Sequence, residues 1–349
     1  MTWIPVLVRD ADRGGRPCLR LGHPLVDRYL DFVSARARPN TTWATAYDLK
    51  VFFSIVAKEP VEVTRADVLG FIVVQRGDRE VVRLVDGEAG LSARTIQRRL
   101  SSISGLFGFL ETCEEIDANP VPTGLANRKR SRTGRGTPLV RVPRTLPTIL
   151  EPAEVDELLA ACRRWRDRAM VEAMVFGALR RAEVLGLRLE DLRVDERRVF
   201  IVNGKGGHQR LVPISTRFFT TVANYLRDER PKASPTDRLF VVLKGPNTGS
   251  ALSLKGLDQL IVSARDRAGL DHCTCHELRH TCLTRLREAG MSLEAIQAQA
   301  GHRSIESTRI YLHLSNDWLA NEYLRASDAI DANRFARDVL ALGDTEVVS

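Results

Sequence analysis

The chain has 349 residues, enough for about two domains of ordinary size. Apolar residues make up 44% of it and charged residues 28%, and no apolar run approaches the roughly 18 residues of a membrane span, so membrane proteins are disfavoured as a class. The net charge of +8 favours a polyanionic partner, and the six cysteines, scattered apart from three near position 275, favour the reducing cytoplasm over a disulfide-stabilised secreted scaffold.

The first third of the chain is predicted to be helical, after a short N-terminal extension over residues 1–20. Apolar residues recur at helical spacing in four segments between residues 21 and 120. The start signals of these helices are Pro24, Thr41 or Thr42, Thr64 and Ser92. This range holds no cluster of acids and bases, so we expect it to be a helical binding module.

Three arginines lie on the polar side of the fourth predicted helix, namely Arg94, Arg98 and Arg99. They are either a solvated face with salt-bridge partners or part of a surface that binds phosphates. The sequence alone leaves both interpretations open.

A basic linker is predicted over residues 121–147. Residues 121–150 hold seven basic side chains and no acid, so the rest of the chain nets only +1. Four prolines and three glycines in the same segment make a regular helix or strand improbable. The segment is either a solvated hinge or a strap along a phosphate backbone, where each basic side chain would release a counterion. Its candidate DNA contacts are Arg128, Lys129, Arg130, Arg132 and Arg135.

The remainder is predicted to be mainly helical with a minor sheet. One helix opens near Pro152, a second covers Arg166–Leu185, and helices resume from residue 253. Two apolar runs flank the glycine-rich turn at residues 203–207, which indicates a β-hairpin. A further short strand is predicted over Leu239–Leu243.

Several polar residues of this second part stand at informative positions. Arg180 and Glu183 lie one helical turn apart, and Lys205 is placed at the tip of the hairpin. The spacing of His276, Arg279 and His280 puts all three on one helix face, where they could receive phosphate oxygens. Taken singly, the Arg180–Glu183 spacing is more typical of a surface ion pair, and the position of Lys205 is more typical of a generic polar turn.

The order of these residues, after an all-helical module, resembles the tyrosine recombinase (phage integrase) family over about residues 20–330. The matching motifs are Gly-x-x-Arg-x-x-Glu at Gly177–Glu183, the hairpin lysine Lys205, His-x-Leu-Arg-His at His276–His280, Gly301-His302, and Thr-x-x-Tyr at Thr308–Tyr311. One departure is minor: this chain has Gly-Ala-Leu-Arg where many relatives have Gly-Leu-Arg, which leaves the Arg–Glu spacing unchanged.

The resemblance implies a two-domain clamp around duplex DNA. Residues 21–120 would be a SAM-like core-binding bundle, and residues 148–330 a mixed α/β catalytic domain of the integrase type with a small antiparallel sheet. The partner would be double-stranded DNA with a specific recombination site, bound by a homotetramer on two such sites. Residues 331–349 would be a C-terminal tail that docks on a neighbouring protomer, as the family's exchange of C-terminal segments implies, while packing on its own domain stays open as the alternative. The family includes phage integrases, recombinases of transposons and integrative elements, and chromosome-dimer resolvases, and it acts in the cytoplasm, at the nucleoid, without a membrane.

The resemblance also implies a role for each motif residue. Arg180 and Arg279 would neutralise the phosphate, and Tyr311 would be the nucleophile that forms a 3′-phosphotyrosyl link. Lys205 would protonate the leaving 5′ oxygen, without metal, ATP or other cofactor.

The other motif residues would assist. His276 would help to transfer the tyrosine proton, and His302 would hydrogen-bond a phosphate oxygen. Glu183 and His280 would support the arginines.

Three other interpretations fit the sequence less well than the resemblance to tyrosine recombinases. A zinc site lacks a Cys-x-x-Cys framework, although candidate ligands gather at His272, Cys273, Cys275, His276, His280 and Cys282. A non-catalytic helix-turn-helix regulator would have its helices at residues 293–300 and 304–313. This interpretation does not explain the presence of Arg180, Lys205 and His276–His280. A DNA-relaxing enzyme of the type IB topoisomerase kind shares the tyrosine chemistry, with Tyr323 as the competing nucleophile.

Overall fold

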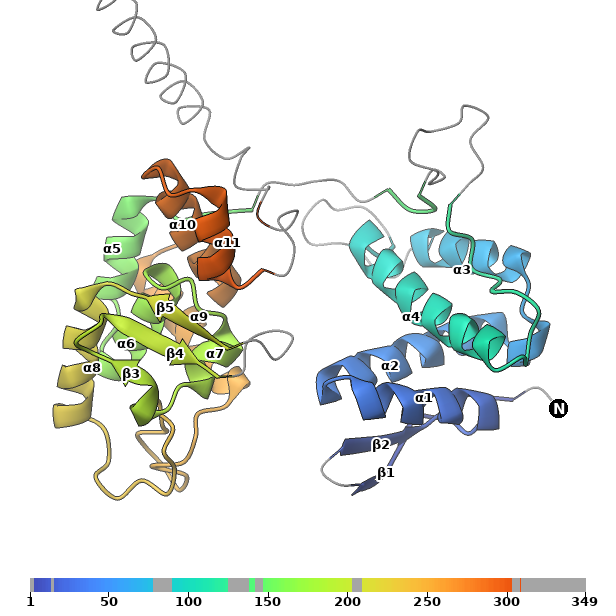
Figure 1. Cartoon of the computed structure of the whole chain (residues 1–349), viewed down its shortest axis with the longest axis horizontal. Coiled ribbons are helices and arrows are strands. Elements are labelled where there is room, and N and C mark those ends of the chain that lie inside the picture. The colour runs from blue at the N-terminus through green and yellow to red at the C-terminus, as the bar shows by residue number, and fades with distance from the viewer. Residues whose placement is uncertain are drawn as a thin grey trace, which may run out of the picture. The chain divides into compact units, whose positions relative to one another are not determined.

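The computed structural model describes residues 3–13, 16–77, 90–124, 138–141, 147–202, 209–302 and 308. The chain divides into two compact units, Met1–Arg144 and Thr145–Ser349 (Figure 1). Their boundary lies within the predicted linker range of 121–147. Among the described residues, no helix is both long and apolar enough to cross a bilayer.

The described part of the first unit is built around the α-helices α1 (Pro24–Arg36), α2 (Pro39–Val56), α3 (Arg65–Gly77) and α4 (Ala93–Thr112), with a 3-10 turn at Pro60–Glu62. Ser92 caps α4 as predicted, because its side chain accepts a hydrogen bond from the backbone N–H of Thr95. The helices bury an aromatic centre in which the ring of Phe52 lies 5.1 Å from that of Phe71 and 6.2 Å from that of Phe107.

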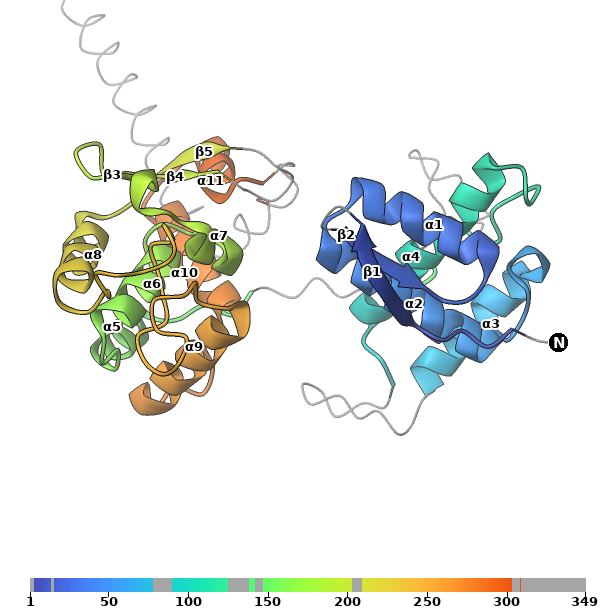
Figure 2. The ribbon, with the colours of Figure 1, turned by 90° about the horizontal axis from the view of Figure 1, so that it is seen from below.

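The same unit also contains a β-hairpin, where the sequence analysis expected no strands. Strands β1 (Val8–Arg13) and β2 (Arg16–Arg20) pair antiparallel beside α1 and α2 (Figure 2). The sequence places Gly14-Gly15 between these strands, and such a dipeptide is a strong two-residue hairpin signal. Leu19 is buried against the helices, so the hairpin belongs to the core of this unit.

The second unit places helices around a small sheet. Strands β3 (Leu192–Arg193), β4 (Arg198–Ile201) and β5 (Arg210–Pro213) form an antiparallel sheet in the order β3-β4-β5. The helices are α5 (Pro152–Ala160), α6 (Trp165–Val175), α7 (Arg181–Gly186), α8 (Thr216–Asp228), α9 (Leu254–Ala268), α10 (Cys275–Glu288) and α11 (Leu293–Ala300), with a 3-10 turn at Leu189–Asp191. Residues 169–175 of α6 are all buried, since α8 and α10 both pack on this helix. The prediction of a mainly helical chain with a small antiparallel sheet is confirmed.

The predicted strand at Leu239–Leu243 is wrong. Only an isolated bridge, between Val241 and Ala251, occurs there. The segment is buried, but its backbone binds other partners: the N–H of Leu239 donates to the carbonyl of Leu187, and the N–H of Val241 donates to the hydroxyl of Tyr225. A continuous apolar run therefore marked core burial and not strand pairing.

Candidate active site

The site begins at a break between α6 and α7, where the sequence analysis predicted one continuous helix. Helix α6 ends at Val175, and Ala178 adopts a left-handed backbone with φ of 54°. A Cβ atom on Gly177 would lie 2.8 Å from the side chain of Ile214, so the turn depends on glycine there. The break makes Arg180 the N-cap residue of α7 and brings its guanidinium into the site.

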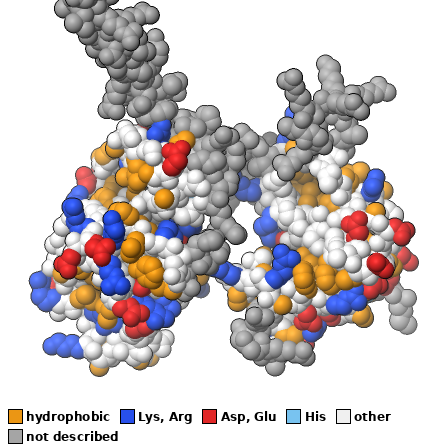
Figure 3. Space-filling view, viewed as in Figure 1, with side chains coloured by type: hydrophobic (Ala, Val, Ile, Leu, Met, Phe, Trp, Pro, Cys, Tyr) orange, Lys and Arg blue, Asp and Glu red, His pale blue; other side chains and the backbone are white. Residues whose placement is uncertain are grey.

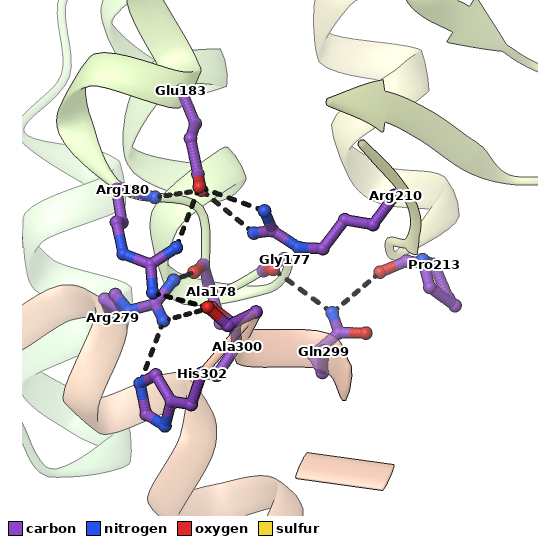
Figure 4. Close-up of polar contacts among 11 residues, drawn as sticks. Gly177, Ala178, Arg180, Glu183, Arg210, Pro213, Arg279, Gln299, Ala300 and His302 are labelled. Atoms are coloured by element: carbon purple, nitrogen blue, oxygen red, sulfur yellow. Dashed lines mark hydrogen bonds and ion pairs between the residues drawn. The ribbon is translucent and has the colours of Figure 1, made fainter. Parts of the chain in front are cut away.

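The carboxylate of Glu183 is the central acceptor of the site (Figure 4). Its Oε1 accepts from Arg180 Nη1 at 2.8 Å and from Arg210 Nη1 at 3.0 Å. Its Oε2 accepts from the backbone N–H of Arg180 at 2.9 Å and from Arg210 Nη2 at 2.9 Å. Burial acts to raise the pKa of Glu183, but the bonds and charges of Arg210 and Arg180 together hold that pKa below its ordinary value.

Arg279 lies on α10 and is only 3% exposed. Its guanidinium donates to the carbonyl oxygens of Ala178 and Ala300, the latter at 2.6 Å, and its Nη2 lies 3.3 Å from His302 Nε2 (Figure 4). A guanidinium only donates, so His302 Nε2 accepts, and the Nδ1–H of this imidazole then donates to Thr308 Oγ1 at 3.1 Å. The backbone of the break and the end of α11 thus fix Arg279 in place.

The two predicted histidines of α10 form a pair. His276 is exposed and His280 half-buried, and their Nε2 atoms lie 2.8 Å apart. Burial and then the nearby His276 and Arg279 lower the pKa of His280 to about 4. At neutral pH His280 is therefore an uncharged support for His276, and one ring donates while the other accepts.

A pocket of about 540 Å³ opens beside these groups, and Arg180, Arg279 and His276 contribute to its lining. The lining also contains Asp258, but this carboxylate pairs with Arg181 at 2.6 Å. The guanidiniums of Arg180 and Arg279 and the imidazole of His276 therefore leave the pocket suited to the oxygens of a phosphate. The thiols of Cys273 and Cys275 also line it, but burial raises the pKa of each to about 12, so they remain protonated at neutral pH. The pocket can hold an anion but offers no thiolate nucleophile.

The structure brings together Arg180, Glu183, Arg279 and His302, and places His276 with His280 on the adjoining face of α10. Lys205 and Tyr311 lie outside the described residues.

One member of the cluster, Arg210, was not among the residues predicted from the sequence. A signal existed: Arg210 and the buried Val212 are two residues apart in β5 and therefore face the same side of the sheet. An inward-facing arginine requires a buried acid as partner.

The predicted DNA contacts of the first unit divide into two groups. Arg94 is exposed, and Arg98 is half-exposed, with its Nη1 2.6 Å from the buried carboxylate of Asp48. Arg99, by contrast, is buried and donates to the side chain of Gln75, so its position favours a structural contact within the bundle.

The five basic linker residues lie outside the described residues. On the face shown in Figure 3, basic and acidic side chains are interspersed over both units. This agrees with the small net charge of the chain without residues 121–150.

Comparison with known proteins relates both units to one group of DNA enzymes. Residues 148–317 match the model of the phage integrase family. The tyrosine recombinase XerC of Vibrio atlanticus is 31% identical over 242 residues, which cover 68% of this chain and 73% of the relative. That of Oceanobacillus iheyensis is 27% identical over 319 residues, which cover 88% of this chain and 97% of the relative.

Solved structures show the same fold. The Tn1549 transposon integrase in complex with transposon right end DNA aligns with a TM-score of 0.65 at 18% identity, covering 87% of this chain and 99% of that chain. The XerH site-specific recombinase bound to its difH substrate aligns with a TM-score of 0.59 at 21% identity. The alignment covers 86% of this chain and 83% of that chain.

Proposed function

The chain belongs to the phage integrase family of tyrosine recombinases, and we propose that it recombines double-stranded DNA at a specific site. The observation that carries this proposal is the convergence of Arg180 and Arg279 on one pocket. Each guanidinium is anchored from behind, by Glu183 and by two backbone carbonyls respectively. The anchoring supports binding of a scissile phosphate in a preorganised site, where charge stabilisation acts most strongly.

The proposed reaction is a phosphoryl transfer that conserves the energy of the phosphodiester bond. The oxygen of Tyr311 attacks phosphorus and becomes linked to the 3′ phosphate, while the bond to the 5′ oxygen breaks. Lys205 donates the proton that the 5′ oxygen takes up, and the tyrosine proton passes towards His276. Arg180 and Arg279 bind the non-bridging oxygens. His302 donates to one of them from Nε2, which requires its proton to move from Nδ1 to Nε2 and its contact with Arg279 to be released. Attack by a 5′ hydroxyl of the partner strand reverses these steps and rejoins the DNA.

Trapping the covalent intermediate tests this function. A duplex enriched by the wild-type protein from a random-sequence library is nicked close to the cleavage point, so that the released fragment diffuses away and rejoining fails. We expect a protein–DNA adduct on a denaturing gel that protease digestion removes, together with a free 5′ hydroxyl. A protein that binds this duplex tightly but never forms the adduct would be a binding regulator.

We expect Lys205→Ala to slow cleavage by about 10²-fold or more, because a general acid is removed, while DNA affinity changes little. The measurement is the single-turnover rate of adduct formation. A substrate with sulfur in place of the bridging 5′ oxygen has a leaving group that needs no proton, so it should restore the variant. If sulfur does not restore the rate, Lys205 contacts a phosphate and is not the acid.

The basic linker is proposed to bind the DNA backbone without reading sequence. Glutamine at all five positions, Arg128, Lys129, Arg130, Arg132 and Arg135, should therefore weaken binding equally on selected and random duplexes. The slope of log affinity against log salt should become shallower by about one unit for each phosphate that the linker no longer neutralises. Titrations at several salt concentrations measure this slope, and an unchanged slope would show that the linker is only a hinge.

We further propose that the first unit is the core-binding module, that the two units clamp the duplex, and that four protomers assemble on two sites at the nucleoid. The predicted tail, residues 331–349, lies outside the described residues. Arg94, which is exposed on α4, supports the DNA-binding role of the first unit, whereas the guanidinium of Arg98 already binds the buried carboxylate of Asp48.

A further inference from the structure

Arg210 is a half-buried arginine of the active site that belongs to none of the family motifs. It is the first residue of β5, its side chain is 13% exposed, and it pairs in register with Ile201 of β4. Both of its terminal nitrogens donate to the carboxylate of Glu183, whose side chain is 2% exposed. A two-pronged contact of this kind fixes the orientation as well as the distance of both groups.

The contact between Arg210 and Glu183 changes the net charge of the group that faces the phosphate. Arg180 and Glu183 alone form a neutral pair, in which the carboxylate would cancel the positive charge offered to a phosphate. Arg210 adds a second guanidinium to the same carboxylate, so the trio carries a net charge of +1. In a buried site, where water screens little, one unit of charge near the phosphate has a large effect on the transition state.

Arg210 also touches the second anchor of Arg180. Nη2 of Arg180 donates to the carbonyl of Gly301 at 3.1 Å. Gly301 itself has φ of 59°, and a Cβ atom there would lie 2.9 Å from Cζ of Arg210. The guanidinium of Arg210 therefore packs directly against Gly301, so it contacts both groups that hold Arg180.

We propose that Arg210 is a positioning residue for DNA cleavage: it neutralises Glu183 so that Arg180 keeps its charge for the scissile phosphate. The proposal rests on the proposed function. Arg210 does not touch the substrate itself, and it acts through Glu183 and Arg180.

The test compares cleavage rates of variants on the nicked duplex described above. Arg210→Gln should slow single-turnover adduct formation by about 10²-fold, as expected for loss of preorganised charge stabilisation, with DNA affinity almost unchanged. Arg210→Lys keeps the charge and should retain most of the rate. The matched control is Arg198→Gln, in strand β4 of the same sheet. Arg198 is 48% exposed, and among the residues that the structure describes its acidic partner is Glu196, outside the site. This control should cleave like the wild type.

A double substitution separates charge from fold stability. In Arg210→Gln, the carboxylate of Glu183 cancels the charge of Arg180, so adding Glu183→Gln should raise the cleavage rate by about tenfold, a difference of 1.4 kcal/mol. Because the double variant also avoids burying an underpaired carboxylate, it should recover fold stability whatever the role of Arg210. Thermal unfolding of each variant is therefore recorded, and the rates are compared well below the lowest unfolding temperature, where a residue that only stabilised the fold would give equal rates in the single and double variants.

Two outcomes would overturn the role of Arg210: a rate for Arg210→Gln equal to that of Arg198→Gln, or no gain in the double variant. Full recovery of Arg210→Gln on the bridging-sulfur substrate would also overturn it, since the defect would then concern the leaving group and not the phosphate charge. If the wild-type protein forms no adduct, the proposed function itself is wrong. If the wild type forms the adduct and the variants give one of the outcomes above, only the role of Arg210 is wrong.

Discussion

Replacing Tyr311 with phenylalanine should abolish the covalent adduct and leave DNA binding intact. The ring remains, so its packing is preserved, but the only atom that can attack phosphorus is removed. We expect no adduct above background on the nicked duplex, and an affinity within about twofold of the wild type, because one hydroxyl contributes little beside many phosphate contacts. Gel-shift titration and a denaturing gel measure the two quantities on the same samples.

Tyr323→Phe is the matched control, because Tyr323 is the competing tyrosine in the same part of the sequence. It should form the adduct at the wild-type rate. An adduct that survives in Tyr311→Phe and disappears in Tyr323→Phe would reassign the nucleophile. Protease digestion leaves only a short peptide attached to the DNA, and mass spectrometry of this peptide identifies the linked tyrosine independently.

Local signals in the sequence predicted the features that depend on neighbouring residues. The cap of α4 follows from a serine before an apolar helical pattern, and the face shared by His276 and Arg279 follows from their spacing on one helix. The antiparallel hairpin of β4 and β5 follows from apolar runs around a glycine-rich turn. In each case the segment that carries the signal is also the segment that adopts the structure.

Features set by distant contacts could not be predicted in this way. The spacing of Arg180 and Glu183 suggested mid-helix neighbours, but α6 ends at Val175 and Arg180 is the N-cap residue of α7. The turn between the helices leaves no room for a Cβ atom at Gly177 beside the distant Ile214. Arg210 was missed because its partner, Glu183, is 27 positions away, in another element. Motif spacing therefore predicted which residues belong to the active site. Only the fold shows that Arg180 and Arg210 share the carboxylate of Glu183.

The second large effect is expected from Arg279→Lys, which should slow cleavage by about 10³–10⁵-fold, the range over which a transition-state arginine acts in phosphoryl transfer. The guanidinium of Arg279 has donors for Ala178, Ala300 and a phosphate together, because its nitrogens point in several fixed directions. A lysine ammonium is a compact charge that can satisfy the carbonyls or the phosphate, but cannot keep both in this geometry. The single-turnover rate measures the loss.

Arg287→Lys provides the control for fold stability. Arg287 lies two turns further along α10, is also buried, and also donates to a backbone carbonyl, that of Met291 at 2.9 Å. It lies outside the pocket lining, so its replacement should cost some thermal stability and little of the cleavage rate. If the two variants lose stability to a similar extent and only Arg279→Lys loses cleavage, the loss belongs to the phosphate contact. Equal cleavage rates in the two variants would instead make Arg279 a residue that holds the break after α6 and leaves the chemistry to Arg180.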